Sequence, residues 1–361
     1  MKLAVGLGVQ DEDWQAAETW ISEVERLGVD SAWGGETWGF DAFTPIAYFA
    51  GKTSRITLGC SIAQVGPRTP AAIAMSALAL ASMTGDRFIL GLGTSGPQVI
   101  EGYHGVPFNP AYTRLREAVE IIRLATSGER VAYEGKVHQL PLPGGEGRAL
   151  RAGAPPRDIP IYLATLGPRS LRMTGELADG WIASSFMPEH AAVFLDEIRA
   201  GAEAAGRNFD EIERVAGGVV QFGDDLDALI QPRKPGFAFE MGAMGSPEHN
   251  FYRDAYDRQG YGELTGQVLK LWLDRKREEA AALIPDDFVI KSNLLGTDEQ
   301  VTERIRVFRD NGITTLRVAP AGETMQQRLD TLGRFVDLFN AVNAEAPSAQ
   351  PNPHGRTGAA G

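Results

Sequence analysis

The stretch TSRITLGCSIAQVGPRTPAAIAMSALALASMTGDRFILGLGTSGPQVIEG, residues 53–102, decides the fold of this chain. It contains two short aliphatic runs, residues 56–60 and 88–92, which have the length and composition of buried strands. Between them, residues 70–83 form a longer apolar run that begins with a proline, as the first turn of a helix often does. A strand, a helix and a second strand in this order predict a parallel sheet covered by helices.

The same alternation of strand and helix continues along the chain. Strands are expected at residues 3–7, 31–33, 56–60, 88–92, 161–164, 181–183, 215–221 and 315–318. Helices are expected at residues 13–27, 42–52, 70–83, 113–125, 169–178, 189–205, about 256–283, 298–311 and 324–342. Eight is the strand number of a barrel. We therefore predict an α/β fold, a single (β/α)8 TIM barrel over residues 1–342 with insertions at its carboxyl-terminal mouth.

Two insertions and a tail interrupt this alternation. Residues 134–158 are rich in Gly, Pro and Arg, which predicts a long surface excursion before the fifth strand. Residues 231–254 mix Gly, Met and aromatic residues with few charges, and we expect them to cap a pocket. Their segment GFAFEMGAMG either forms a lid over an apolar substrate or packs on the barrel. Residues 343–361 have no apolar period and are predicted to be disordered.

Composition and charge exclude several classes of function. The 361 residues include 43% hydrophobic side chains and 42 glycines, enough for a large buried core. The formal net charge of −12 argues against a nucleic-acid partner or an anionic membrane partner, because their phosphates would repel the surface. The single cysteine, Cys60, excludes an internal disulfide and fits a reducing compartment. No signal peptide and no membrane helix is expected, so a cytoplasmic protein is predicted.

In a barrel of this kind the reactive residues lie at the carboxyl ends of the strands. The second predicted strand is followed by GGETWGFDAF, which places Glu36, Trp38 and Asp41 at the mouth. Asp41 could equally cap the next helix, and Trp38 could fill a gap in the packing. The fourth strand is followed by GLGTSGPQVIEGYHG, whose small residues let the main chain approach a flat ring or a phosphate, although an ordinary tight turn has the same composition. After the fifth strand, Arg169 begins a helix suited to anion binding or is simply part of a capped helix.

Several kinds of chemistry lack support in the sequence. None of the five histidines has a metal-ligand spacing, so no metal site is predicted. The chain has no GxSxG motif, and no histidine lies near Cys60 in the sequence, which leaves nucleophilic hydrolysis unsupported. His104 and His249 fall in predicted mouth loops, where each has either a structural role or a role near substrate. An enzyme without metal or nucleophile, but with a glycine-lined mouth, takes its chemistry from a cofactor.

At these loops the sequence resembles the luciferase-like flavin and deazaflavin oxidoreductases. The likeness spans about residues 2–342, and its most specific pieces are residues 53–102 and IPIYLATLGPRSLRMTGELADGW, residues 159–181. The order of RF-LGLG and SGPQV-EG is similar to the branch that uses the deazaflavin coenzyme F420. The resemblance implies hydride transfer between C5 of the deazaflavin and a small organic substrate.

The resemblance also implies a set of site residues. Family members carry a non-prolyl cis peptide that backs the central ring of the cofactor, here between Ser61 and Ile62. Glu36 and Gln64 would contact the ring or its side chain, and residues 166–168 the phosphate-bearing arm. The full set implied to bind the cofactor is Glu36, Ser61, Ile62, Gln64, Thr94, Ser95, Gly96, Leu166, Gly167, Pro168 and Arg169. A positive rim for the anionic tail is expected from Arg68, Arg169, Arg172, Arg233 and Lys234, although most of these arginines could equally be solvated helix charges.

The sequence departs from the sugar-phosphate dehydrogenases of this group at two positions. They have a histidine and a glutamate where this chain has Thr37 and Gly96, so their acid/base pair is missing and their substrate cannot be assumed. Candidate proton donors are Glu36, Tyr103, His104 and His249. Of these, Glu36 and His104 are the predicted catalytic residues. Substrate contacts are expected from Trp38, Tyr103, Phe239 and His249.

The sequence is compatible with two other functions, and it predicts one assembly. Both flavin types would fit the same slot, so an FMN-dependent monooxygenase that works with a separate reductase is the alternative enzyme. A non-catalytic binding or interaction protein would have kept the barrel and lost the proton-transfer groups. The apolar helix AAIAMSALALASM exceeds what one barrel face requires, and together with the resemblance it predicts a homodimer.

Overall fold

The computed structural model describes residues 1–9, 13–245 and 250–345, and its centre is a closed barrel of parallel strands. The strands follow one another around the barrel in chain order, and pairing of the last with the first closes it. They are β1 (Lys2–Gly6), β2 (Ser31–Gly34), β3 (Thr57–Cys60), β5 (Phe88–Gly93), β8 (Ile161–Leu163), β9 (Gly180–Ile182), β10 (Glu213–Ala216) and β13 (Thr315–Arg317). A short strand, β4 (Ala63–Gln64), adds to β5 at the mouth. The predicted (β/α)8 barrel is confirmed.

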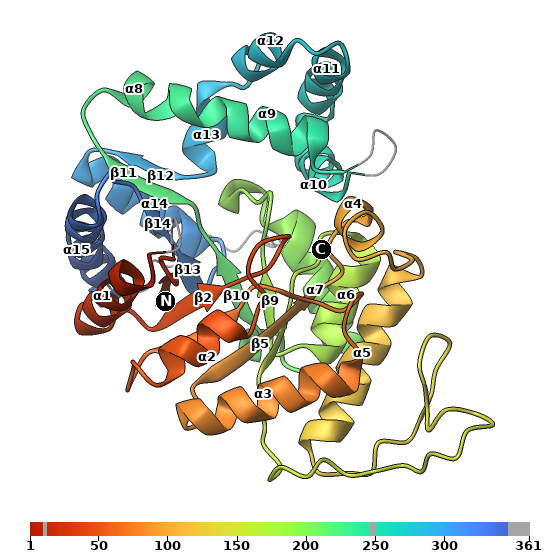
Figure 1. Cartoon of the computed structure of the whole chain (residues 1–361). Helices are drawn as coiled ribbons and strands as arrows, with labels where there is room; N and C mark the ends of the chain where they lie inside the picture. Colours follow the sequence, from red (N-terminus) through yellow and green to blue (C-terminus); the bar gives the residue numbers. More distant parts are fainter. Residues whose placement is uncertain (10–12, 246–249, 346–361) are drawn as a thin grey trace, which may run out of the picture.

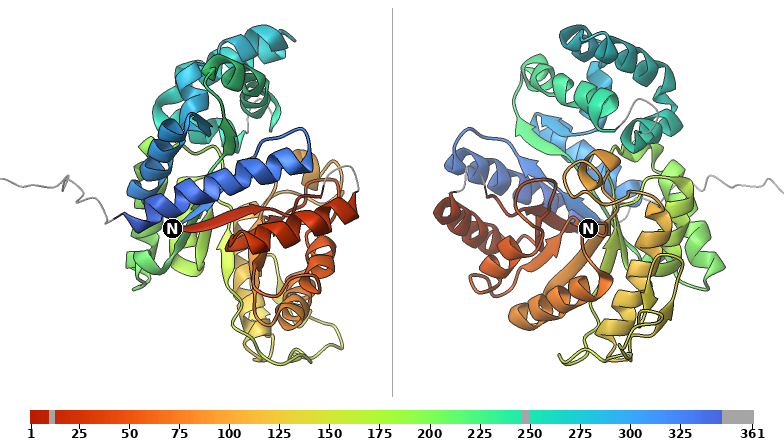
Figure 2. Two further views of the ribbon diagram at one scale, coloured as in Figure 1. Left: turned by 90° about the vertical axis from the view of Figure 1, so that its left-hand side faces the viewer. Right: turned by 45° about the vertical axis from the view of Figure 1, so that its right-hand side comes forward.

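Helices surround the barrel, as Figures 1 and 2 show. They are α1 (Trp14–Arg26), α2 (Thr44–Ala50), α3 (Pro70–Thr84), α4 (Pro97–Ile100), α5 (Ala111–Thr126), α6 (Pro168–Leu177), α7 (Ala192–Ala204), α14 (Asp298–Asp310) and α15 (Met325–Ala344). Short 3₁₀ turns occur at η1 (Pro188–His190) and η2 (Phe209–Glu211). Thr297 and Thr324 begin α14 and α15 with capping boxes, in which side chain and backbone satisfy each other's hydrogen bonds.

Two layers of side chains hold the barrel together. Successive residues of a strand point to opposite faces, so each strand contributes to both layers. A small cluster that includes Ala4, Trp33, Tyr162, Ile182 and Val215 forms one layer, and a large cluster between strands and helices forms the other. In the large cluster the fully buried Trp181 donates from its indole N–H to the carbonyl oxygen of Thr165.

A helical cap covers the mouth of the barrel. The strand predicted at residues 215–221 divides at Gly217 and Gly218, where an added Cβ would meet backbone oxygens at 1.9 and 2.3 Å. Beyond this break β11 (Val219–Phe222) leaves the barrel and pairs with β12 (Leu294–Gly296) and β14 (Ala319–Pro320). The helices that follow β11 lie above the barrel in Figure 1.

The cap corrects two expectations about secondary structure. Residues 231–245, expected as part of an insertion loop, include η3 (Gln231–Arg233) and α9 (Lys234–Ala243). The helix predicted at about residues 256–283 is divided where Gly260 and Arg275 have positive φ angles of 96° and 62°. The remaining cap elements are α8 (Leu226–Ile230), α10 (Phe251–Tyr256), η4 (Asp257–Tyr261), α11 (Gly262–Leu273), α12 (Arg277–Ala282) and α13 (Asp286–Lys291). They enclose a hydrophobic cluster of their own.

The two insertions lie at different ends of the barrel. Residues 134–158 connect α5 to the start of β8, so this excursion lies opposite the cap rather than at the mouth (Figure 1). It includes a short hairpin of β6 (Tyr133–Glu134) and β7 (Gln139–Leu140). The predicted tail, residues 343–361, falls outside the described residues from residue 346 onward, and α15 extends to Ala344. In the described ranges no helix is both long and apolar enough to span a membrane.

Helices α6 and α7 touch through their backbones, and this contact is testable. A Cβ added at Gly201 would lie 1.9 Å from the carbonyl oxygen of Arg172. Gly201→Ala must force the helices apart, and overpacking of this kind costs about 1–3 kcal/mol in free energy of unfolding. Gly333→Ala in α15 is the matched control, because nothing lies within 4 Å of its added Cβ; it should stabilise by about 0.5–1 kcal/mol. Urea denaturation of both variants measures the difference, and equal stabilities would contradict the close contact.

Candidate active site

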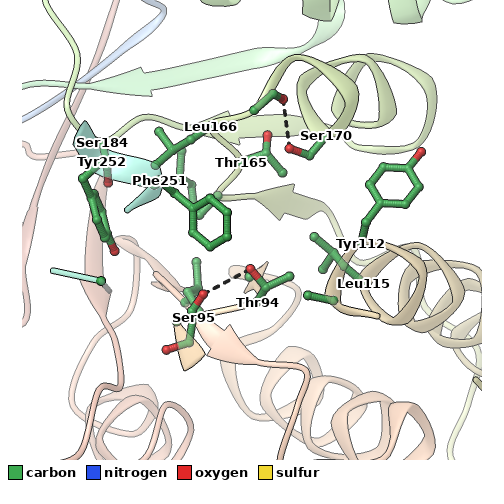
Figure 3. A pocket seen from close by; sticks show the side chains of 18 of the residues that line it. Thr94, Ser95, Tyr112, Leu115, Thr165, Leu166, Ser170, Ser184, Phe251 and Tyr252 are labelled. Carbon is green, nitrogen blue, oxygen red and sulfur yellow. Dashed lines mark hydrogen bonds between the residues drawn. The ribbon is translucent and has the colours of Figure 1, made fainter. Parts of the chain in front are cut away.

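A cavity of about 570 Å³ opens at the carboxyl ends of the barrel strands, beneath the cap. Its walls come from the ends of β3, β5, β8, β9 and β13, from α5 and α6, and from α10 of the cap. Figure 3 shows Phe251 and Tyr252 of α10 facing the strand end at Thr94 and Ser95 across this space. The mouth is therefore open to a ligand of substantial size.

The end of β3 forms one wall of the cavity. The peptide bond between Ser61 and Ile62 is cis, at the position that the resemblance predicts, and both residues line the cavity. Neighbouring strands approach this main chain closely. A Cβ added at Gly35 would lie 2.3 Å from the Ser61 oxygen, and one added at Gly91 would lie 2.0 Å from the Cys60 oxygen. Only glycine allows this approach without displacement of the backbone.

The glycine-rich turn after β5 also lines the cavity. Thr94, Ser95 and Gly96 all face it, as predicted. Ser95 has a positive φ of 57°, and its carbonyl oxygen accepts a hydrogen bond from the Thr94 hydroxyl at 3.3 Å (Figure 3). The turn therefore offers hydroxyl groups next to a bare main chain.

The start of α6 supplies a second polar wall. The predicted residues Leu166, Gly167, Pro168 and Arg169 line the cavity together with Ser170. The first backbone N–H groups of a helix have no acceptor within it, and no side chain caps this one. The Arg169 guanidinium lies 3.9 Å from the centre of the Tyr112 ring of α5, which holds it at this rim. The arrangement suits a phosphate or carboxylate.

Glu36 reaches the cavity, but its carboxylate is fully engaged. It accepts hydrogen bonds from the backbone N–H groups of Ala42 at 3.0 Å and Gln64 at 2.8 Å, and it forms an ion pair with Arg68. These bonds tie the loop after β2 to the chain after β3, which gives Glu36 a structural role. A proton-donor role would first require these bonds to break. Gln64 is buried behind it and donates to the Thr37 carbonyl oxygen at 3.0 Å, so its side chain does not line the cavity.

The other predicted catalytic and substrate residues are not brought to the cavity. Trp38, Tyr103 and Phe239 have exposed fractions of 61%, 65% and 45%, and none of them is among the lining residues. His104 packs against the ring of Tyr103, also away from the lining. Because α9 is a helix, Phe239 packs on Trp272 of α11 instead of facing the mouth. The prediction for His249 lies outside the described residues.

The predicted positive rim is reduced to one residue. Arg68, Arg172 and Lys234 form ion pairs within the protein, with Glu36, Glu197 and Asp286 respectively, and none of the three lines the cavity. Arg233 donates to the side-chain oxygen of Gln221 at 2.6 Å. Arg169 alone of the five lines the cavity.

Sequence reasoning missed several lining residues. They are aromatic or polar residues that were not named as site residues: Phe108, Tyr112, Ser184, Phe251, Tyr252 and Arg317. Arg317 had a signal, since it is the one charged residue in the predicted strand at residues 315–318. The aromatic pair of α10 lies within residues 231–254, which were expected to cap a pocket, but no apolar period in the sequence sets the direction of the two side chains.

A buried carboxyl group links the cap to the barrel near this cavity. Glu240 of α9 accepts hydrogen bonds from the Ser185 hydroxyl after β9 and from the Tyr256 hydroxyl of α10. Burial raises the pKa of Glu240, and the two hydrogen bonds only partly oppose this shift. Ser184 and Tyr252, neighbours of this cluster in the chain, line the cavity. In the described ranges no three His, Cys, Asp or Glu side chains gather as metal ligands would.

Comparison with protein families identifies one match over most of the chain. The family model described as luciferase-like monooxygenase matches residues 2–315. A Mycobacterium tuberculosis protein with the name "Putative coenzyme F420-dependent oxidoreductase" is 36% identical over 343 residues, covering 91% of this chain and 98% of that protein.

Solved structures show the same fold. The coenzyme F420-dependent tetrahydromethanopterin reductase of Methanopyrus kandleri is 25% identical with a TM-score of 0.75, covering 92% of this chain and 97% of that one. An F420-dependent secondary alcohol dehydrogenase in complex with an F420-acetone adduct has a TM-score of 0.74 at 16% identity, covering 94% and 98%. The second likeness is evidence for the barrel fold alone.

Replacing Glu240 by glutamine tests the protonation of the buried carboxyl. Because its pKa is raised, the folded protein keeps a proton that the unfolded chain releases as the pH rises above 4.5. The wild type should therefore lose stability as the pH rises from 4.5 through the raised pKa. The amide side chain of Glu240→Gln does not titrate in this range. The free energy of unfolding of the variant relative to wild type should therefore rise by up to about 1.4 kcal/mol per pH unit in that window.

Urea denaturation from pH 4.5 to about 8 measures this difference. The matched control is Glu278→Gln, an exposed position on α12, whose stability relative to wild type should not change with pH. A difference for Glu240→Gln that stays constant over the range would contradict the protonated state.

Proposed function

The chain belongs to the luciferase-like monooxygenase family, and from this we propose that it is a coenzyme F420-dependent oxidoreductase acting on a small organic substrate. The relative with 36% identity and the reductase with 25% identity both carry F420 in their names. The observation that carries the proposal is the cavity, which combines a bare main-chain wall at Ser61 and Ile62 with an anion-binding rim at α6.

The residues present fit this cofactor in three parts. Ile62 and the turn at Gly93 offer a flat, apolar surface for a tricyclic ring. Thr94 and Ser95 offer hydroxyl groups for a ribityl chain. The free N–H groups of α6 and the guanidinium of Arg169 offer positive charge to a phosphate-bearing tail. When bound, F420 would supply hydride transfer at C5 of its ring.

The chain's own contribution is positioning and exclusion of water. Phe108, Phe251 and Tyr252 wall the cavity with aromatic surface, which removes water from a bound ligand. Thr37 and Gly96 occupy the places of the acid/base pair of the sugar-phosphate dehydrogenases, and Glu36 is held by its ion pair. A substrate held over the ring in a fixed orientation needs no covalent nucleophile from the protein.

We also propose that the protein works in the cytoplasm, without a nucleic-acid or membrane partner. Its formal net charge of −12 disfavours both kinds of surface. Its one cysteine, Cys60, is buried, and burial raises the pKa of the thiol to about 12, so the side chain is inert.

A cofactor titration tests the proposed function. F420 should bind the purified protein at micromolar concentration, and FMN should not. Arg169→Gln should weaken F420 binding about tenfold, because one charge at the phosphate is lost. The same variant should bind the phosphate-free deazaflavin riboside as the wild type does, which separates the tail contact from a folding defect.

Absorbance and fluorescence of the deazaflavin report the binding, and a substrate screen then follows its redox change. Tight binding of FMN without binding of F420 would replace this proposal by the two-component monooxygenase. Failure to bind either compound would favour a non-catalytic protein.

We propose that the protein is a homodimer formed through α3. Met75 and Met83 of α3 have exposed fractions of 69% and 55%, large for apolar side chains eight positions apart on one helix face. Light scattering should give twice the 38.9 kDa mass of the chain. Met75→Asp combined with Met83→Asp should give the monomer mass with an unchanged far-ultraviolet circular dichroism spectrum. A monomeric wild type at working concentration would contradict the proposal.

A further inference from the structure

Arg317 ends the last barrel strand and lines the cavity. Its Nη1 group donates a hydrogen bond to the Ser61 hydroxyl at 2.7 Å, which holds the guanidinium beside the wall formed by Ser61 and Ile62. A guanidinium carries five N–H donors, and this bond uses one of them. Donors therefore remain for a ligand that enters the cavity.

The charge of Arg317 is not balanced by the protein. Among the described residues, no carboxylate lies within ion-pair distance of it, whereas Arg68, Arg172 and Arg304 all have acidic partners. Burial lowers the pKa of Arg317, and no neighbouring charge opposes that shift. Arg317 is half-buried, and a charge partly withdrawn from water is costly unless it is paired, so a permanent cation in this position favours an anion from the ligand.

The tail of the proposed cofactor does not provide that anion. The anion-binding rim with Arg169 follows β8, whereas Arg317 ends β13. Strands β9 and β10 stand between them on the shorter way around the closed barrel, so the two cations belong to separate positions around the mouth. One phosphate-bearing arm at α6 therefore leaves Arg317 without a partner.

We propose that Arg317 binds the carboxylate of an acidic substrate, and this inference rests on the proposed function because it assigns the substrate class of the same cavity. The planar guanidinium matches a carboxylate with two parallel hydrogen bonds, which fixes orientation as well as charge. The substrate is thereby held beside Ser61 and Ile62, over the wall at which the cofactor ring is expected. Phe251 and Tyr252 of α10 line the same cavity with aromatic surface, so the substrate is a small organic acid with an apolar body.

Pairs of probes that have nearly the same shape and differ only in the charge of one group test whether the site prefers a carboxylate. The probes are cinnamate with cinnamamide, and pyruvate with pyruvamide, titrated calorimetrically with and without saturating F420. In at least one pair the wild type should bind the acid at least about tenfold more tightly than the amide. Arg317→Gln should remove this preference. Arg317→Lys should retain part of it, because the positive charge remains but the planar guanidinium with its two parallel hydrogen bonds is lost.

Arg169→Gln provides the opposite pattern as a control. It should weaken F420 and keep the preference for the acid, whereas Arg317→Gln should leave the F420 dissociation constant within about threefold of wild type. Circular dichroism and thermal midpoints compare the fold of the variants, and Arg317→Lys keeps the test valid if the glutamine variant unfolds.

Three results would overturn the inference. The first is equal binding of acid and amide in both pairs, and the second is a preference for the acid that survives in Arg317→Gln. The third is a loss of F420 affinity of tenfold or more in Arg317→Gln, which would assign the cation to the cofactor. A preference for the acid that depends on Arg317 in a protein that does not bind F420 would support the carboxylate site and reject the proposed cofactor, so the two failures are distinguishable.

Discussion

The close approach of main chains at the ends of β2, β3 and β5 is the constraint on which the site depends. A side chain at Gly35 or Gly91 would overlap the carbonyl oxygens of Ser61 or Cys60, so these strand ends can lie together only with glycine. Their closeness leaves a wall of backbone and Ile62 at the mouth, while large side chains such as Trp33 and Tyr162 fill the barrel interior. The cavity exists because these positions carry no large side chains, and the polar groups that line it are arranged around that space.

The cap depends on a second close approach, at Gly217 and Gly218. There the seventh strand passes the backbone of Arg317 and of Ser292, leaves the barrel and continues as β11 in a separate sheet. Because the chain leaves the barrel here, α9 and α10 lie over the mouth. There Glu240 accepts a hydrogen bond from the Ser185 hydroxyl of the barrel. The cap has its own hydrophobic cluster, and further hydrogen bonds join it to the barrel. Gln259 accepts from the Met187 N–H and donates to the Ser185 carbonyl oxygen, and Arg258 donates to the Leu166 carbonyl oxygen.

Most of the barrel could be predicted from the sequence because its signals are local. Short aliphatic strands and the proline at the start of residues 70–83 act within a few residues of the element that they define. The cap could not be predicted in the same way. The segment GFAFEMGAMG has little apolar period, so nothing local shows that it is helical or that Phe239 turns away from the mouth. Glu36 was placed correctly at the mouth, but its engagement by Arg68 depends on a contact between residues 32 positions apart.

The distribution of charge explains how a strongly acidic protein can select an anionic ligand. The net charge of −12 is spread over the whole chain, whereas the carboxylate at the cavity, Glu36, is already neutralised by Arg68. Arg169 and Arg317 therefore dominate the local field inside a space walled by apolar rings, where water screens charges weakly. An acidic surface repels anions at long range, but salt screens that repulsion within about 8 Å. In the proposed function, affinity would thus be decided by the two arginines at short range, and their separation around the barrel would let one hold a cofactor tail while the other holds a different anion.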